Sequence, residues 1–161
     1  MIWRALLLCL LPLRAYALSC TPYGIQDAYL DAVESTDTYV IVRGTLSFDE
    51  RTFPKVDWNH QDKVPPVTNI SARISGVHLG SLGKRASFSK DVTLSVRCFG
   101  PWCGGAHNGD VVAFLRRDDT RYILETDPCG GFLFGSPTSD HMRLLQQCLD
   151  GKSCEPTAFP E

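Results

Sequence analysis

The pattern of apolar positions predicts one helix near each end of the chain. Residues 24 to 34 carry apolar side chains three and four positions apart, on a face made of Ile25, Ala28, Tyr29, Ala32 and Val33. A similar stripe near the other end consists of Met142, Leu145, Cys148 and Leu149. Because Ser136 offers a side-chain cap and Pro137 suits a first helical turn, we expect this second helix to begin at that pair and to end at Gly151.

Between the two helices the pattern changes to that of β-strands. Short segments are rich in β-branched and aromatic residues or alternate between apolar and polar side chains; they are residues 38–46, 67–79, 91–98, 110–116 and 122–126. The alternation is cleanest where Val92, Leu94 and Val96 share one face. The last two segments flank the charged tip at residues 117–120 and predict a hairpin.

These elements predict a mainly β fold. Residues 49–66 are polar, contain three prolines and show no sustained period, so we expect an exposed loop insertion there, and residues 155–161 form a tail. Short antiparallel strands leave edges exposed unless the sheet closes. We therefore expect a five-stranded Greek-key barrel, similar to the OB fold, with a short N-terminal helix and a C-terminal helix.

The N-terminus predicts export. Arg4 is followed by an apolar run from Ala5 to Leu13, which is too short to span a bilayer as a stable helix. The small residues of Ala15-Tyr16-Ala17 suit a signal-peptidase site. We therefore interpret residues 1–17 as a cleavable signal peptide and residues 18–161 as one secreted or periplasmic domain.

The cysteine count supports this interpretation. The chain has seven cysteines, and removal of Cys9 with the signal leaves an even number, namely Cys20, Cys98, Cys103, Cys129, Cys148 and Cys154. An even number is typical of a disulfide framework in an exported protein. A lipoprotein signal acylated at Cys20 is the alternative, and it would attach the protein to a membrane. Lipidation would leave one thiol unpaired, and Arg14 interrupts the apolar approach.

Composition and motifs narrow the classes of function. The chain carries 16 basic and 18 acidic residues, for a net charge of −2. Loss of the signal peptide removes two arginines and makes the net charge more negative. This balance argues against nucleic acid and anionic membranes as partners. The histidines are scattered, and the motifs His-Glu-x-x-His and Gly-x-Ser-x-Gly do not occur. We expect a protein that is not an enzyme, uses no cofactor and is a monomer.

Three stretches of the chain resemble the netrin-like family, which includes the tissue inhibitors of metalloproteinases. They are Leu18-Ser19-Cys20-Thr21-Pro22, the strand from Val40 to Leu46, and the run from Tyr122 to Cys129 followed by Phe132, Phe134 and a capped helix. The resemblance covers nearly the whole mature chain and implies an OB-type barrel. It also implies a disulfide between Cys20 and Cys129. Adjacency then pairs Cys98 with Cys103, and Cys148 with Cys154.

The chain departs from this family at its start. The inhibitors begin with a cysteine whose free amine and carbonyl bind the catalytic zinc of the target protease, and a second cysteine follows two residues later. Here Leu18 stands in place of the first cysteine, and only Cys20 is present. The resemblance therefore implies a protein partner, with a metalloprotease as one candidate, but Leu18 and Ser19 would be held less rigidly than the start of the inhibitors. The expected function is a disulfide-bonded binding or inhibitory module of unknown ligand, and protease inhibition of this type is one candidate.

Two further sets of residues are candidates for a site. Aromatic side chains in loops and turns could mark a binding face, and they are Trp58, Phe99, Trp102, Phe132 and Phe134. Alternatively, Cys98, Cys103 and His107 lie at short, ligand-like intervals and could hold zinc or act in redox chemistry. The two interpretations differ in the state of the thiols, because a disulfide removes them as ligands.

Overall fold

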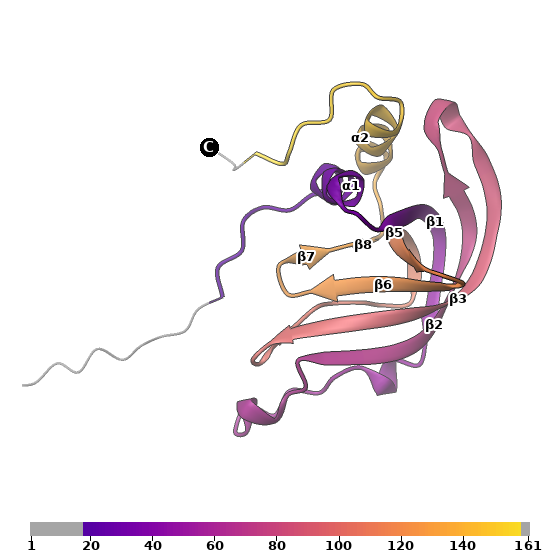
Figure 1. Ribbon diagram of the computed structural model, residues 1–161. Helices are drawn as coiled ribbons and strands as arrows, with labels where there is room; N and C mark the ends of the chain where they lie inside the picture. The colour runs from indigo at the N-terminus through magenta and orange to yellow at the C-terminus, as the bar shows by residue number, and fades with distance from the viewer. Residues whose placement is uncertain (1–17, 159–161) are drawn as a thin grey trace, which may run out of the picture.

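The computed structural model describes residues 18–158, so the predicted signal peptide lies outside the described residues. It contains the helices α1 (Ile25–Glu34) and α2 (Ser139–Leu149). The strands are β1 (Thr38–Phe48), β2 (Val67–Leu79), β3 (Arg85–Phe99), β4 (Trp102–Cys103), β5 (Gly109–Asp118), β6 (Arg121–Asp127), β7 (Gly130–Gly131) and β8 (Leu133–Gly135). Figure 1 shows the two helices side by side, next to the curved sheet.

Five of the strands close into a ring. β1 pairs with β2, β2 with β3, β3 with β6, β6 with β5, and β5 with β1 again. The β3–β6 pairing is parallel and the others are antiparallel. The sheet is thus barrel-like, and the expected mainly β fold with five ring strands and a helix at each end is confirmed.

The observed bounds differ from the predicted ones where pairing does not depend on the side-chain pattern. β2 has the predicted bounds, whereas β3 begins at Arg85, six residues before the predicted start. Residues 85–90 are mostly polar or small, and they join the sheet because their backbones pair with residues 74–79 of β2. The short strands β4, β7 and β8 also escaped prediction, because two or three residues carry no period.

The second helix begins later than predicted. Thr138 is its N-cap, with a side-chain oxygen that accepts a hydrogen bond from the backbone N–H of His141 at 3.2 Å. Ser136 has a φ of 46°, which lies outside the helical region, so the prediction of a start at Ser136 is wrong. The end is as expected, because the helix stops at Leu149 and Gly151 follows with a φ of 68°.

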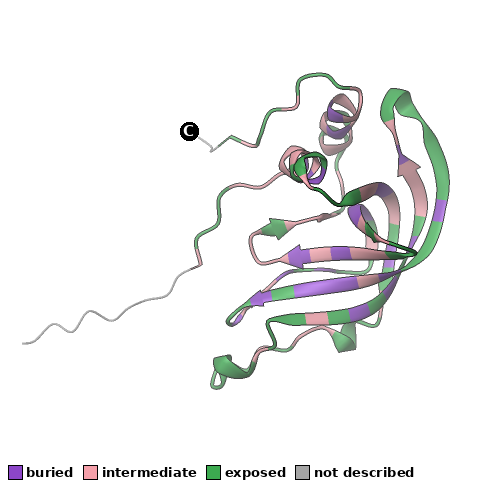
Figure 2. Ribbon diagram, viewed as in Figure 1, coloured by how far each residue is buried: buried purple, intermediate pink, exposed green. Residues whose placement is uncertain are grey.

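The described chain has two clusters of buried apolar side chains. One fills the ring and includes Val92, Leu94 and Val96, as the alternation predicts; the intervening Ser95 is buried as well, so Figure 2 shows a continuous buried stretch in this part of β3. The other lies between the sheet and the helices and includes Ile25, Ala28 and Phe114. Val33 was expected on the buried face of α1, but it is 63% exposed, so that part of the prediction is wrong.

The long β2–β3 hairpin bends toward α2 and is fastened to it. Gly44 of β1 lies opposite Gly76 of β2, and a methyl group on either glycine would strike the backbone of the other strand. At the far end, the backbone N–H of Leu82 donates to the Asp150 carboxylate at 2.7 Å. The hairpin therefore covers one side of the helix layer. Within residues 18–158, no helix has the length and apolar character that a membrane span requires.

The C-terminal tail returns to the first helix. A disulfide joins Cys148 to Cys154, and the backbone N–H of Thr157 donates to the Asp27 carboxylate at 3.2 Å. The backbone N–H of Gly24 donates to the same carboxylate at 2.7 Å. Partial burial opposes ionisation, but the hydrogen bonds from Thr157 and Gly24 prevail and hold the pKa of Asp27 below its ordinary value.

This arrangement predicts a pH-dependent contribution to stability. Because the pKa of Asp27 is lower in the folded chain, its contribution is present above the ordinary pKa of about 3.9 and is lost as pH falls through the lower folded value. Asp27→Asn is therefore expected to be less stable than the wild type near neutral pH and equally stable well below the folded pKa. Urea unfolding at both pH values measures this difference, and a gap of the same size at both would contradict the assignment.

Candidate functional site

Two disulfides lie at the end of the barrel where β3 and β6 finish. Cys20 is bonded to Cys129, just after β6, with 5.2 Å between their Cα atoms. Cys98 is bonded to Cys103 across the β3–β4 pair, with a Cα separation of 3.9 Å. The two regions touch at Gly104. The chain there lies so close to the end of β6 that a Cβ on residue 104 would be 2.6 Å from the backbone nitrogen of Asp127. We call residues 18–21, 66–67, 97–104 and 126–129 the clamped end.

All three expected cysteine pairings are present in the structure. The third, Cys148–Cys154, lies beyond α2 and does not belong to the clamped end. Three disulfides in a domain of this size indicate folding in an oxidising environment of the extracellular type.

The clamped end exposes apolar surface around the Cys98–Cys103 bridge. Phe99 is 43% exposed, and its backbone is paired with that of the half-buried Trp102 across the β3–β4 turn. Val67, at the start of the neighbouring strand, is 46% exposed. The preceding residue, Pro66, accepts a hydrogen bond from the backbone N–H of Cys98 at 2.9 Å. Apolar side chains from two strands therefore flank one braced turn.

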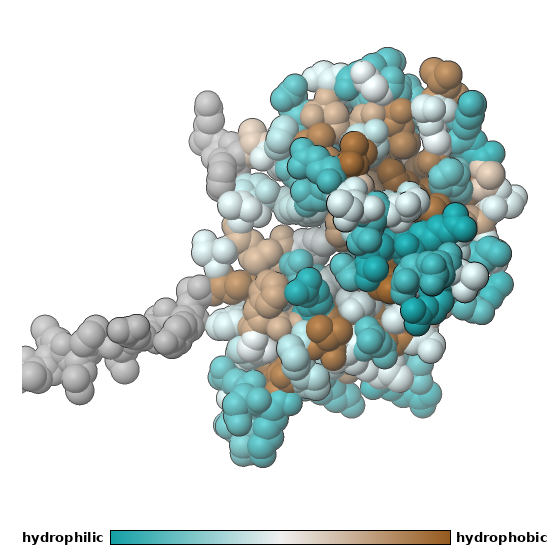
Figure 3. All heavy atoms as spheres, in the orientation of Figure 1, coloured by the Kyte–Doolittle hydropathy of each residue, from teal (hydrophilic) through white to brown (hydrophobic). Residues whose placement is uncertain are grey.

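The N-terminal segment reaches the same end. Leu18 is half-buried, Ser19 is exposed, and the Cys20–Cys129 bridge fastens both to the end of β6. Figure 1 shows this segment on the side of the barrel where the arrow of β6 ends, and Figure 3 shows apolar residues mixed with polar ones there. Of the predicted binding residues, Leu18, Ser19, Phe99 and Trp102 thus belong to the clamped end.

The other candidate aromatic residues have different surroundings. Trp58 is 63% exposed in the 49–66 loop, where its backbone oxygen accepts a hydrogen bond from the Gln61 side chain at 3.1 Å. Phe134 packs on the buried Phe114 with 6.1 Å between ring centroids, and Phe132 lies 4.8 Å from the ring of Tyr39. Phe132 and Phe134 are therefore packing residues of the helix layer, and their expected role at a binding surface is not supported.

The cysteines of the alternative metal or redox site form a disulfide in the structure. Cys98 and Cys103 are bonded to each other, so their sulfurs are not free thiolates, and His107 is an exposed residue of the following loop. Among the residues that the structure describes, no three His, Cys, Asp or Glu side chains gather as metal ligands.

A small acidic cavity adjoins the Cys20–Cys129 bridge, and no pattern in the sequence predicts it. Its volume is about 210 Å³, and its charged lining residues are Asp31, Arg97, Glu125 and Asp127. The Tyr23 hydroxyl donates to the Asp31 carboxylate at 2.7 Å. Burial, the hydrogen bond to Asp31 and the nearby carboxylates raise the pKa of Tyr23, so this phenol remains a donor. The lining comes from α1, β3 and β6, which only the tertiary fold brings together.

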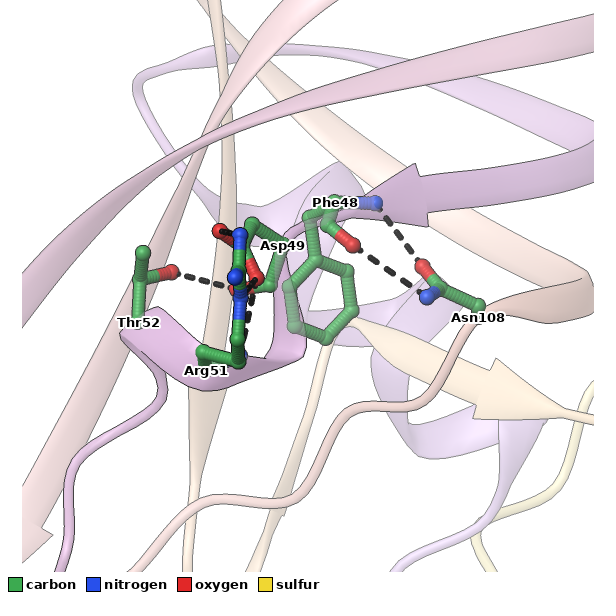
Figure 4. A network of polar contacts seen from close by, with 5 residues as sticks. All are labelled: Phe48, Asp49, Arg51, Thr52 and Asn108. Carbon is green, nitrogen blue, oxygen red and sulfur yellow. Dashed lines mark hydrogen bonds and ion pairs between the residues drawn. The ribbon is translucent and has the colours of Figure 1, made fainter.

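At the far end of β1, a polar network holds the start of the 49–66 loop (Figure 4). The Asn108 side chain accepts from the backbone N–H of Phe48 at 2.8 Å and donates to the Phe48 carbonyl at 3.2 Å. The backbone N–H of Asn108 donates to Glu50 at 3.0 Å. Asp49 accepts hydrogen bonds from Arg51, which keeps its pKa below the ordinary range. The Asn108 side chain thus bonds both backbone groups of Phe48, as a residue of a paired strand would.

Removal of this side chain is expected to loosen the loop. Asn108→Ala loses both bonds to Phe48, which are exposed to solvent, and should lower the free energy of unfolding by about 1 kcal/mol. Asn108→Asp keeps the acceptor but turns a carboxylate oxygen toward the Phe48 carbonyl, so it should be at least as destabilised as Asn108→Ala. Urea unfolding of the two variants gives the values; an alanine variant as stable as the wild type would show that water replaces the bonds.

The chain matches no protein-family model, and comparisons with curated proteins and with solved structures find no significant match.

Proposed function

We propose that the protein is an exported, monomeric binding module, and not an enzyme, that holds a protein partner at its clamped end. The carrying observation is the exposed apolar surface formed by Phe99, on the turn braced by the Cys98–Cys103 bridge, and by Val67 at the start of the neighbouring strand. Exposed apolar side chains that cluster on a soluble domain are typical of interaction sites. Aromatic residues such as Phe99 and Trp102 are also favoured as anchors in interfaces.

Rigidity supports this proposal. A partner gains little affinity from a mobile loop, because the loop must be ordered on binding. At the clamped end, one bridge joins β3 to β4 and the other joins the N-terminal segment to the end of β6. The backbone that carries the exposed side chains is therefore held in place before a partner arrives.

The compartment of this binding is proposed to be the periplasm or the extracellular space. The three disulfides and the predicted signal peptide at residues 1–17 point in the same direction. The resemblance to the netrin-like family makes a metalloprotease one candidate partner, approached through Leu18 and Ser19. Inhibition of zinc endopeptidases by the mature protein, measured with fluorogenic peptides, tests this candidate separately from binding itself.

Site-specific photo-crosslinking tests the proposed surface. A photoreactive phenylalanine analogue replaces Phe99 in one variant and Leu82 in the other, and each variant is exported by its native host. Leu82 is the matched control because it is 80% exposed but lies at the tip of the β2–β3 hairpin. A polypeptide that crosslinks from position 99 and not from position 82 supports the proposal. Equal products at both positions, or none at position 99, contradict it.

A further inference from the structure

The first part of β3 has a strand partner on one side only. β2 pairs with β3 from Arg85 to Arg97, whereas the other side of β3 pairs with β6 at Thr93–Val96 and with β4 at Cys98–Phe99. Within the described chain, no strand pairs with residues 85–90 on that side. We call residues 85–90 of β3 the free edge. Its length matches that of a typical strand, so one further strand could be added there.

The hydrogen bonds around β3 show which backbone groups point to the free edge. Lys84 faces β2, because its carbonyl accepts from the backbone N–H of Gly80 at 2.9 Å. Arg97 faces the other side, because its carbonyl accepts from the backbone N–H of Gly104 at 2.9 Å. The two sides alternate along a strand, so the odd-numbered residues face away from β2. Those of the free edge are Arg85, Ser87 and Ser89, and no hydrogen bond described within residues 18–158 uses their outward N–H and C=O groups.

The free edge belongs to a hairpin that is held in place at its tip. Figure 1 shows this end of the β2–β3 hairpin beside α2. The Asp150 carboxylate accepts from the backbone N–H of Leu82 at 2.7 Å, and the Gln146 side chain donates to the Gly80 carbonyl at 3.4 Å. The free edge contains no proline, and all its residues are exposed except the buried Phe88. An added strand would therefore meet a backbone that is already extended and accessible.

The free edge carries positive charge. Lys84 precedes it, Arg85 and Lys90 belong to it, and no ion pair described within residues 18–158 includes any of the three. The neighbouring Asp91 carboxylate accepts from Arg73 at 2.6 Å instead. Lysine on an exposed edge commonly discourages pairing with other strands. Such charges repel a basic strand, but they attract one that carries carboxylates at the opposite positions.

A second copy of this chain does not suit the free edge. If the three outward-facing residues pair with those of the copy, Ser87 lies opposite Ser87, and Lys84 then lies opposite Lys90 at both ends. Like charges directly opposite each other destabilise a pair of strands. The suitable occupant is therefore a strand of a different sequence, with carboxylates opposite the basic residues of the free edge.

We propose that the free edge binds an extended acidic segment of another polypeptide, which joins the sheet as a further strand beside β3. Backbone hydrogen bonds to the three outward-facing residues hold the segment, and its carboxylates opposite Arg85 and Lys90 provide selectivity. The inference does not depend on the proposed function, because the free edge and the clamped end share no residue.

Two-dimensional NMR of the mature protein tests the inference with three blocked peptides. The acidic probe is Glu-Glu-Thr-Val-Thr-Glu-Glu. A basic probe has lysine in place of each glutamate, and a proline probe, Glu-Glu-Pro-Pro-Pro-Glu-Glu, keeps the charge but lacks the central N–H donors. At up to about 5 mM, a range that detects weak binding, the acidic probe should shift the amides of residues 85, 87 and 89 and slow their hydrogen exchange. The other two probes should leave these amides unchanged.

Three variants complete the test. Ser87→Pro removes one outward N–H and no bond to β2, a position where an edge strand tolerates proline, and it should weaken the acidic probe at least tenfold. The matched control, Ser87→Thr, keeps this N–H and should bind as the wild type does. The double variant Arg85→Glu/Lys90→Glu leaves the backbone intact and should bind the basic probe in place of the acidic one.

Three outcomes would overturn the inference. The first is that the acidic probe leaves the free edge unchanged, and the second is that the proline probe shifts it equally, which would indicate attraction by charge alone. The third is that a folded Ser87→Pro variant, or the double variant, binds the acidic probe as the wild type does. The double variant decides the question if Ser87→Pro does not fold.

Discussion

Replacement of both Cys20 and Cys129 by serine is expected to lower the free energy of unfolding by about 4 to 5 kcal/mol. The two residues are 109 positions apart in the sequence, so the loop that the bridge closes contains α1 and the strands β1 to β6. In the chain-entropy account, a crosslink over a long loop removes the most freedom from the unfolded state. The loss is large compared with the total stability of an ordinary domain, about 5 to 15 kcal/mol.

A second bridge gives the control for this prediction. Cys148 and Cys154 are only 6 positions apart, so their double serine variant should lose about 2 kcal/mol. Urea unfolding of both variants and the wild type, without reductant, measures the two losses. Equal losses would contradict an effect that depends on loop length.

Truncation of Phe114 to alanine is the second large effect that we expect, at about 4 kcal/mol. The Phe114 side chain is fully buried in β5 between the sheet and the helices, where it packs on Phe132 and Phe134. Its removal leaves a cavity in the layer that joins both helices to the barrel. Such a cavity costs the lost burial of the ring and the lost contacts of its neighbours.

The matched control is the same substitution at Phe99. This ring is 43% exposed, so Phe99→Ala should lower the free energy of unfolding by less than about 1 kcal/mol. Chemical unfolding measures both variants under the same conditions. If Phe114→Ala cost no more than Phe99→Ala, the helices would not depend on this packing. A folded Phe99→Ala also makes that variant suitable for binding measurements.

The side-chain pattern was sufficient to predict most of the fold. Alternation along β2 gave its bounds, because Ile70, Ala72 and Ile74 all face the interior and the exposed residues between them are polar. The pattern was insufficient for residues 85–90, because only Phe88 among them is apolar and buried, and the other five residues enter β3 through backbone pairing with β2. The start of α2 was misplaced because Ser136 and Thr138 are both good caps in sequence, and only the φ of 46° at Ser136 separates them.

The candidate sites were less predictable, because they depend on contacts between distant segments. The aromatic residues of the turn at 99–102 could be found from the sequence, but the exposure of Val67 beside them depends on the β2–β3 register. A groove of about 610 Å³, lined by β1, β2, β3 and the start of β6, arises in the same way. Its opposite sides, near Asp91 and Arg121, are neighbours because β3 and β6 pair in parallel, and no local pattern predicts that pairing.

Affinity for the crosslinked partner is the most direct test of the central claim that the clamped end is the binding surface. Titration calorimetry compares the wild type with Phe99→Ala and with Leu82→Ala, a control in which an even more exposed side chain is removed. We predict that Phe99→Ala weakens binding by about 10-fold or more, as expected for an interface anchor, and that Leu82→Ala binds as the wild type does. Unchanged affinity in Phe99→Ala, or an equal loss in both variants, would contradict the claim.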